Sequence, residues 1–279
     1  MLTLPPNVQP TASQSTSSQQ SPRRDRYDLA DVAVVIVAYN AEQTIASVLD
    51  RLPQTFAEHV GAILVSDDGS SDATTEVARR WAATHPHVNL TVVQQPINLG
   101  YGGNQKFCYR WALEHDCSIA VMVHGDGQYA PELVGSIIAP LLRGGADAVF
   151  GSRMLIPGGA RKGGMPMYKF VGNRILTTVQ NLCAGLRLSE WHSGYRAYNL
   201  HRLDVAGLAK MSDGFDFDTE IILSLAKRKR TITEVPIPTF YGNEKCNVNG
   251  MRYAVDVLGE VIKFRARRNE PSVELMNAA

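Results

Sequence analysis

Short, unbroken apolar runs alternate with amphipathic segments from about residue 31 to residue 155. The runs are VAVVIVA (32–38), AILVS (62–66), LTVVQ (90–94), IAVMVH (119–124) and ADAVFGS (146–152). The segments between them, such as YNAEQTIASVLDRL and APELVGSIIAPLLRG, carry apolar residues at helical spacing. A strand that is covered on both faces reads as a continuous apolar run. The pattern therefore predicts an α/β fold, a doubly wound and mostly parallel Rossmann-like sheet with helices on both faces.

The pattern changes after Ser152. IPGGARKGGMP (156–166) is a basic, glycine-rich loop, which is either a solvated turn or a mobile lid. Helices are expected in YKFVGNRILTTVQNLCAGL and FDTEIILSLAKRK, and a strand in TITEVPIP. GMRYAVDVLGEVIKFRARR predicts an amphipathic helix with a basic end. We expect one domain over 28–268, with a first part at 31–155, a second at 156–250 and this helix at 250–268.

The two ends of the chain differ in composition from the rest. Residues 1–27 contain the stretch TASQSTSSQQSPRR, which has no large aliphatic side chain and predicts a disordered tail. It also lacks the apolar core of a secretory signal. Residues 269–279 are expected to be a flexible C-terminus.

The overall composition is that of an ordinary globular protein, with 44% apolar and 20% charged residues. Lysine and arginine number 28 against 27 acidic residues, so no bulk positive charge favours a nucleic-acid partner. The four cysteines have no metal-binding spacing, which favours a reduced, cytoplasmic protein. No apolar stretch reaches the ~18 residues of a membrane span.

Polar clusters stand where four of the predicted strands end. They are Tyr39–Asn40, Asp67–Asp68–Gly69, His124–Gly125–Asp126 and Gly151–Ser152–Arg153. In an open parallel sheet, ligands bind beyond the carboxyl ends of the strands. The four clusters therefore predict one shared pocket at that edge.

The residue types in these clusters indicate the ligand. A tyrosine can cover a nucleotide base, and an aspartate can accept a hydrogen bond from a base N–H. Asp126 can coordinate a divalent cation that neutralises a diphosphate, and Arg153 can hold phosphate oxygens. Neither a dinucleotide-binding glycine motif nor a P-loop motif is present at the expected place. We therefore predict a nucleotide-diphosphate site.

With these residues in place, the chain resembles family 2 glycosyltransferases with the GT-A fold. It is most similar to the branch of dolichyl-phosphate mannose and glucose synthases and their bacterial relatives. The resemblance is carried by VAYNAEQTI, VSDDGSSDAT, NLGYGGNQ, HGDGQYAPE, GSR, GNR, HSGYRAY and YGNEK. It implies inverting transfer of a sugar from a UDP- or GDP-sugar to a polyprenyl or dolichyl phosphate, or to another glycan acceptor. It also implies a nucleotide-binding half at 31–155 and an acceptor half at 156–250.

The resemblance assigns the nucleotide to the first two strand ends. Val37, Ala38 and Tyr39 match the segment that cradles the base, and Asp67 and Asp68 match the acidic pair that contacts base and ribose.

The sequence departs from the family pattern Pro-x-Tyr-Asn-Glu in this region. Val37 replaces the proline and Ala41 replaces the glutamate, so the neighbouring Glu42 is the candidate substitute. Thr239 stands near a position where the family commonly has an arginine.

The resemblance also implies a divalent metal, Mg²⁺ or Mn²⁺. Asp126 matches the second aspartate of the family's Asp-x-Asp metal triplet, and Gln128 matches the neighbouring polar ligand. His124 occupies the first position of the triplet, with Gly125 between the two. Imidazole can itself be a ligand or a hydrogen-bond donor to a diphosphate, so we expect an altered but working site.

Further residues match the family's phosphate and acceptor positions. Arg153 matches an arginine that binds donor and acceptor phosphates, and Lys245 matches a lysine that reaches the donor diphosphate. Ser193 and Arg196 lie where such enzymes contact the acceptor.

The need for a catalytic base depends on the acceptor. A lipid phosphate is already an anion, whereas a sugar hydroxyl requires a carboxylate base. Glu190 is the best base candidate in the sequence, and Asp218 and Glu220 are weaker ones. His192 is expected to be structural.

Two other functions stay open at this point. A nucleotidyltransferase would share the fold region and the metal, although its glycine-rich first loop is missing here. A sugar-nucleotide-binding pseudoenzyme is suggested by the altered triplet. The apolar stripe of 251–264 with its basic end predicts either core packing or peripheral contact with an anionic membrane.

Overall fold

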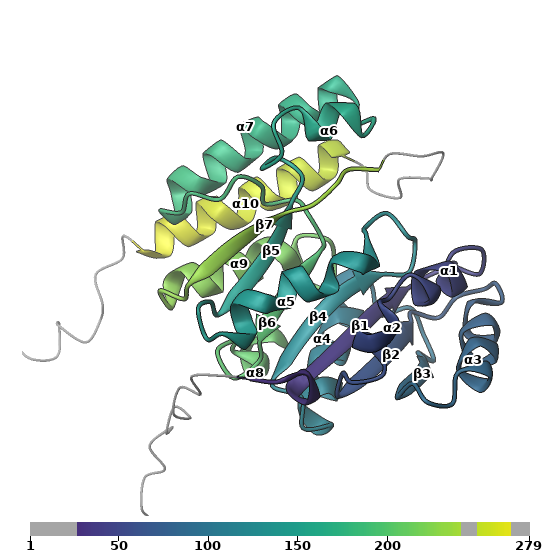
Figure 1. Cartoon of the computed structure of the whole chain (residues 1–279). Coiled ribbons are helices and arrows are strands. Elements are labelled where there is room, and N and C mark those ends of the chain that lie inside the picture. Colours follow the sequence, from purple (N-terminus) through teal and green to yellow (C-terminus); the bar gives the residue numbers. More distant parts are fainter. Residues whose placement is uncertain (1–26, 241–249, 269–279) are drawn as a thin grey trace, which may run out of the picture.

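The computed structural model describes residues 27–240 and 250–268, which form a single seven-stranded sheet with helices on both faces (Figure 1). The strand order is β3-β2-β1-β4-β6-β5-β7. The strands are β1 (Val32–Ala38), β2 (Ala62–Asp67), β3 (Leu90–Gln94), β4 (Ile119–His124), β5 (Ala148–Ser152), β6 (Arg196–Asn199) and β7 (Ile232–Pro236). The tails predicted at the two ends of the chain, apart from Tyr27, lie outside the described residues.

Six of the strands run parallel, and β6 runs antiparallel between β4 and β5. The predicted mostly parallel, doubly wound α/β fold is confirmed. The prediction missed β6, because a four-residue strand of sequence RAYN gives no apolar run. As a consequence, the first five strands do not form a sheet of their own: β5 reaches β4 only through β6.

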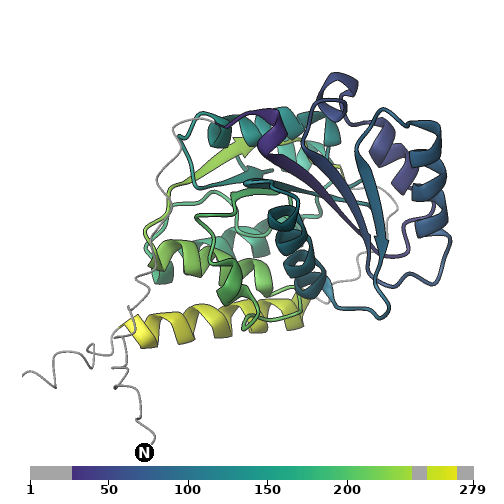
Figure 2. The same ribbon diagram turned by 90° about the horizontal axis from the view of Figure 1, so that it is seen from below.

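The helices divide between the two faces of the sheet (Figure 2). One face packs against α1 (Ile45–Asp50), α2 (Gln54–Ala57), α3 (Thr74–Thr84) and α5 (Val134–Leu142). The other packs against α4 (Tyr101–Glu114), α8 (Val205–Leu208) and α9 (Phe217–Lys227). Short 3-10 helices occupy Leu29–Asp31 and Pro131–Leu133.

Three helices from the second part of the chain complete the fold. They are α6 (Gly159–Lys162), α7 (Met167–Ala184) and α10 (Gly250–Arg268). The long helices α7 and α10 lie side by side, and α10 also packs on α9 (Figure 1). No helix in the described ranges combines the length and the apolar character needed to cross a bilayer.

The unbroken apolar runs follow from burial on both sides. Val32, Val34 and Ile36 of β1 point into one core, whereas Ala33 and Val35 point into the other, and all five are 0% exposed. Because successive side chains of a strand point to opposite faces, a strand buried on both sides must be apolar at every position. This pattern identified the strands of the parallel sheet.

Gly102 marks the tightest contact between α4 and the start of α9. A Cβ atom at this position would lie 2.6 Å from the Ser212 carbonyl oxygen and 2.7 Å from Cβ of Phe217. Only a residue without a side chain allows the backbones to approach this closely. Gly135 of α5, in contrast, has nothing within 4 Å of its hypothetical Cβ.

We predict that Gly102→Ala lowers the free energy of unfolding by about 1–3 kcal/mol, because the added methyl group overpacks the contact between α4 and α9. Gly135→Ala is the matched control and should leave stability unchanged or raise it by up to about 1 kcal/mol. Urea denaturation measures both values. Equal stability of the two variants would contradict the assigned packing of α4 on α9.

Candidate functional site

The polar clusters at the strand ends lie on one edge of the sheet. In the strand register, Val37 pairs with both Ser66 and His124, and Ala38 pairs with Asp67. β5 runs parallel to these strands, because the antiparallel β6 lies between it and β4. The segments that begin with Tyr39, Asp68, Gly125 and Arg153 therefore leave the sheet at the same edge.

The loop after β1 and the loop after β2 are joined by hydrogen bonds. The Asn40 N–H donates to Ser70 Oγ (2.8 Å), and the Ser71 N–H donates to Asn40 Oδ1 (3.0 Å). Asn40 has a φ of 50°, a left-handed conformation that asparagine tolerates. Tyr39 stays 51% exposed beside these bonds. The two loops thus form one fixed rim with a tyrosine ring available on it.

Asp67 and Asp68 are buried, and each holds part of this rim. Asp67 accepts hydrogen bonds from the Ser70 N–H (3.0 Å) and from the hydroxyls of Ser70 and Thr75. Asp68 accepts the Leu99 N–H (2.7 Å), and burial raises its pKa. Both carboxylates therefore shape the loops: Asp67 closes the turn after β2, and Asp68 holds the start of the segment before α4.

Glu42 is also engaged by the protein. Its carboxylate accepts the N–H of Ala73 (3.0 Å), directly before α3, and its own N–H donates to Asp72 (3.1 Å). A carboxylate at a helix N-terminus compensates unpaired backbone N–H groups. In this conformation Glu42 stabilises the start of α3.

The segment after β4 lies against the end of β1. The Gly125 N–H donates to the Val37 carbonyl (2.9 Å), and a Cβ on Gly125 would lie 3.0 Å from Cβ of Ala38. Asp126, which is half-buried, accepts the Gln128 N–H through Oδ1 (3.0 Å). The Asp126 carboxylate therefore stands in a tight turn beside the proposed base-binding segment.

His124 is enclosed by aromatic rings. Its Nε2 lies 3.5 Å from Tyr101 Oη, and the edge of its ring meets Tyr129 with centroids 5.0 Å apart. A Cβ on Gly194 would come within 2.4 Å of Nε2, so glycine is required there. Nε2 thus faces the protein, and metal coordination through Nε2 would require the ring to turn.

The chemistry of these side chains fits a metal that is shared with a ligand. Among residues 27–240 and 250–268, no group of three or more His, Cys, Asp or Glu side chains is arranged to hold a metal ion. Mg²⁺ in nucleotide sites is commonly held by one or two carboxylates, with phosphate oxygens and water completing its shell. Asp126 could supply one such carboxylate, and Gln128 is its near neighbour in the sequence.

Arg153 and Glu190 form a buried pair. Glu190 Oε2 accepts the Arg153 backbone N–H (2.7 Å), and Oε1 accepts from Nε (2.9 Å), from Nη2, and from Asn173 of α7 (2.9 Å). The Glu190 side chain is 0% exposed, and burial alone would raise its pKa, but Arg153 brings the pKa below the ordinary value. This geometry favours positioning of Arg153 over the base role that the sequence suggested for Glu190.

Ser193 and Arg196 are buried below the edge rather than presented to a ligand. Arg196 is 1% exposed and donates to the carbonyl oxygens of Trp191 (2.7 Å), Ser193 (2.7 Å) and Asp218 (3.1 Å). Its guanidinium also lies 3.5 Å from the Asp218 carboxylate. In this conformation these bonds fix the 191–193 segment, and the acceptor contacts expected of Ser193 and Arg196 stay a prediction.

His192 is a neighbour of the Arg153 pair. Its carbonyl accepts from Arg153 Nη2 (3.1 Å), and its Nδ1 lies 2.9 Å from the Tyr253 hydroxyl of α10. Burial lowers the pKa of His192 to about 4, so the ring is neutral at neutral pH. These contacts agree with the structural role expected for His192.

Tyr129 is a residue of the site that the sequence did not reveal. Its hydroxyl accepts the Gly194 N–H (2.8 Å), and burial raises its pKa. Arg153, Glu190 and Asp126 all lie close enough to influence that pKa. Tyr129 therefore stands between the Asp126 turn and the Arg153 pair. A tyrosine near a strand end is common in cores, so no sequence signal distinguished it.

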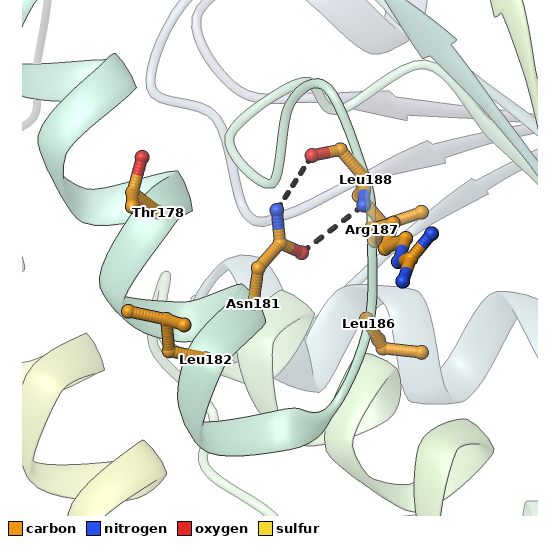
Figure 3. A pocket seen from close by; sticks show the side chains of 6 residues that line it. All are labelled: Thr178, Asn181, Leu182, Leu186, Arg187 and Leu188. Atoms are coloured by element: carbon orange, nitrogen blue, oxygen red, sulfur yellow. Dashed lines mark hydrogen bonds between the residues drawn. The ribbon is translucent and has the colours of Figure 1, made fainter.

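Lys245, the predicted diphosphate-binding lysine, lies outside the described residues. A cavity of about 400 Å³ lies at the C-terminal end of α7, where the Asn181 side chain bonds the N–H and carbonyl of Leu188 (Figure 3). None of the predicted site residues lines this cavity.

Comparison with known proteins identifies the family. The sequence profile of Glycosyl transferase family 2 matches residues 33–199. The chain is 31% identical to undecaprenyl-phosphate mannosyltransferase of Micrococcus luteus, with 76% of this chain and 84% of that one covered. It is 28% identical to UDP-N-acetylglucosamine–dolichyl-phosphate N-acetylglucosaminyltransferase of Methanococcus voltae, with 75% and 86% covered.

Among solved structures, glucosyl-3-phosphoglycerate synthase of Mycobacterium tuberculosis, crystallised with Mn²⁺, UDP-glucose and phosphoglyceric acid, has a similar fold. The TM-score is 0.63 at 19% identity, with 84% of this chain and 79% of that one covered. The profile match spans more than half of the chain and includes β1 to β6. The chain therefore belongs to glycosyl transferase family 2 and is a glycosyltransferase with the GT-A fold.

Proposed function

We propose that this enzyme transfers a sugar from a UDP- or GDP-sugar to a polyprenyl or dolichyl phosphate, with inversion at the anomeric carbon. The relatives named above act on undecaprenyl phosphate and on dolichyl phosphate, and together they support a lipid-phosphate acceptor. The named structural neighbour was crystallised with UDP-glucose, which supports a nucleotide-sugar donor.

The choice of acceptor rests on one observation: each candidate catalytic base is already held in an ion pair or a hydrogen bond. Glu190 is paired with Arg153, Asp218 is paired with Arg196, and Glu220 accepts the Ser212 N–H (2.6 Å). A sugar hydroxyl needs a carboxylate that can take its proton, whereas a phosphate is already an anion. Three engaged carboxylates therefore favour a phosphate acceptor.

On the donor side, the nucleotide would be held by Val37 and Ala38 at the end of β1, by Tyr39 on the rim, and by the segments that Asp67 and Asp68 hold in place. Asp126, with Gln128, would hold a divalent cation shared with the diphosphate. That ion, Mg²⁺ or Mn²⁺, would stabilise the charge of the leaving diphosphate. Mn²⁺ in the structural neighbour supports this cofactor.

Arg153 would place its positive charge beside phosphate oxygens at the same edge. Glu190 accepts hydrogen bonds from its guanidinium and is itself held by Asn173, and the Arg153 side chain is 12% exposed. A guanidinium held in one orientation loses little entropy when it binds an anion. Arg153 is thus suited to hold the phosphates of donor and acceptor in place.

We also propose peripheral contact with an anionic membrane through the outer side of α7 and α10. Tyr168, Ile175 and Leu182 of α7 are 73%, 59% and 74% exposed, and Val255 and Ile262 of α10 are 65% and 63% exposed. α7 has two basic residues and no acidic one, although the whole chain has a net charge of only +1. An apolar stripe with basic residues on a helix suits a surface of anionic lipid.

The transfer reaction is tested with purified protein, Mn²⁺, undecaprenyl phosphate in detergent, and UDP-glucose, UDP-N-acetylglucosamine or GDP-mannose. We expect at least one donor to give a glycosylated lipid phosphate, detected by mass spectrometry.

Asp126→Asn should abolish the tightening of nucleotide binding by Mn²⁺. His124→Ala should weaken metal affinity by no more than about 10-fold, because His124 is a neighbour of the metal ligand Asp126 and does not itself bind the metal.

Two outcomes would contradict this function. Binding of nucleotide without transfer from any donor would indicate a pseudoenzyme. Release of pyrophosphate from a nucleoside triphosphate and a sugar phosphate would indicate a nucleotidyltransferase.

The positioning role of Glu190 predicts that Glu190→Gln and Asn173→Ala both lower kcat/KM by about 10-fold, since each loosens the hold on Arg153. Steady-state kinetics with the active donor measures both, and thermal melting checks that both variants are folded. A general base would behave differently: Glu190→Gln would then lower kcat by about 10²- to 10⁴-fold, with Asn173→Ala near wild type.

Membrane contact is tested by sedimentation with vesicles. We expect binding to vesicles that contain phosphatidylglycerol and little binding to pure phosphatidylcholine. The double variant Ile175→Glu, Leu182→Glu should weaken binding by about 10-fold or more, because each change removes an exposed apolar side chain that would enter the lipid. Ile97→Glu is the matched control, since Ile97 is 65% exposed on another part of the protein. If the double variant instead breaks a dimer in light scattering, the face joins two copies of the chain.

A further inference from the structure

Phe215 is an aromatic residue that remains exposed although its surroundings are well ordered by hydrogen bonds. It lies directly before α9 and is 42% exposed, whereas Phe217, two residues later, is 0% exposed. Phe217 supplies the core contact of this turn. The ring of Phe215 therefore needs another explanation than core packing.

The segment that carries Phe215 is held firmly against the start of α4. The Gly102 N–H donates to the Asp213 carbonyl (2.8 Å). Lys106 Nζ donates to the Met211 carbonyl (2.6 Å) and lies 2.8 Å from the Asp213 carboxylate. The Gly214 N–H is fixed as well, by Ser212 Oγ at 3.0 Å. Because this backbone is already ordered, binding of a ligand here would cost little conformational entropy.

The Phe215 ring stacks on Tyr101, and Tyr101 in turn lies beside His124, the first residue of the His124–Gly125–Asp126 triplet. The two ring centroids are 5.0 Å apart with an angle of 27° between the planes. Tyr101 donates to Asp218 Oδ2 (3.0 Å), and its oxygen lies 3.5 Å from His124 Nε2. The centroids of Tyr101 and His124 are 5.7 Å apart. Phe215 is thus one ring removed from the residue that begins the triplet with Asp126.

We infer that Phe215, backed by Tyr101, is the surface against which the sugar ring of the donor packs. This inference rests on the proposed function, in which the diphosphate lies at Asp126 and the sugar extends from it. One face of a pyranose ring presents C–H groups, which are apolar and carry slight positive charge. An aromatic face is apolar and carries slight negative charge, so the two faces attract each other while apolar area leaves water.

The hydrogen bond between Tyr101 and Asp218 explains how the Phe215 ring is supported. Bonds to Asp218 hold Tyr101 in one orientation, and Tyr101 in turn supports the exposed ring of Phe215. A rigid aromatic residue can distinguish sugars by which of their hydroxyl groups point toward the ring. Phe215 is therefore a specificity-determining residue for the donor sugar.

The test compares nucleotide with sugar nucleotide. Calorimetric titration with Mn²⁺ gives the Kd of UDP and UDP-glucose, and of GDP and GDP-mannose, for each variant. Phe215→Ala should raise the Kd of the bound sugar nucleotide by about 10-fold and change that of the free nucleotide less than about twofold. Phe215→Tyr should restore binding, whereas Phe215→Leu should not, because leucine keeps apolar bulk without a ring. Tyr168→Ala, an exposed ring on α7, is the control and should change neither value.

Each other outcome counts against the inference. If Phe215→Ala weakens nucleotide and sugar nucleotide equally, or weakens neither, the inference is wrong and the proposed function stands. If Phe215→Leu binds as wild type does, the aromatic ring is not required. If the wild-type protein binds no sugar nucleotide at all, both the proposed function and this inference fail.

Discussion

A buried ion pair between Arg196 and Asp218 connects the 191–193 segment with Tyr101 at the edge of the sheet where the strand-end clusters lie. The pair lies 3.5 Å apart, with Arg196 only 1% exposed. Burying charges is costly unless each is paired and hydrogen-bonded. Arg196 meets this condition by bonding the carbonyls of Trp191 and Ser193, and Asp218 meets it by bonding Tyr101. One charge thus fixes the 191–193 segment, and the other fixes the Tyr101 ring beside His124.

The helix α7 connects the edge with the outside of the molecule. Its Asn173 bonds Glu190 and so contributes to the orientation of Arg153. On the same helix, Ile175 and Leu182 are 59% and 74% exposed. One face of the helix therefore belongs to the site that would receive a phosphate, and another face offers apolar side chains. This arrangement suits an acceptor whose phosphate must be reached at the surface of a membrane.

The sequence was sufficient for the parts of the fold that depend on local patterns. Strands β1, β2, β4 and β5 are buried on both faces and are mostly apolar, so their runs were visible in the sequence. The edge strand β3 is only partly buried, and its run LTVVQ was visible through its β-branched residues. The shared edge followed as well, because parallel strands end on the same side. β6 escaped prediction, because its four residues carry no pattern and its place between β4 and β5 depends on pairing across the chain.

The sequence by itself determined the parallel strands, the family resemblance and the residues from which a site could be built. Only the tertiary structure decided which of these residues are engaged by the protein. Tyr101 and Asp218 are separated by 117 positions, and Glu190 meets Arg153 across 37. Contacts between residues this far apart in the chain leave no periodic pattern in the sequence. A polar residue also gives no sign in the sequence of whether it is buried or available to a ligand. Folding brought these residues together, so that Arg196 bonds the carbonyl of Trp191 and Glu190 bonds the guanidinium of Arg153.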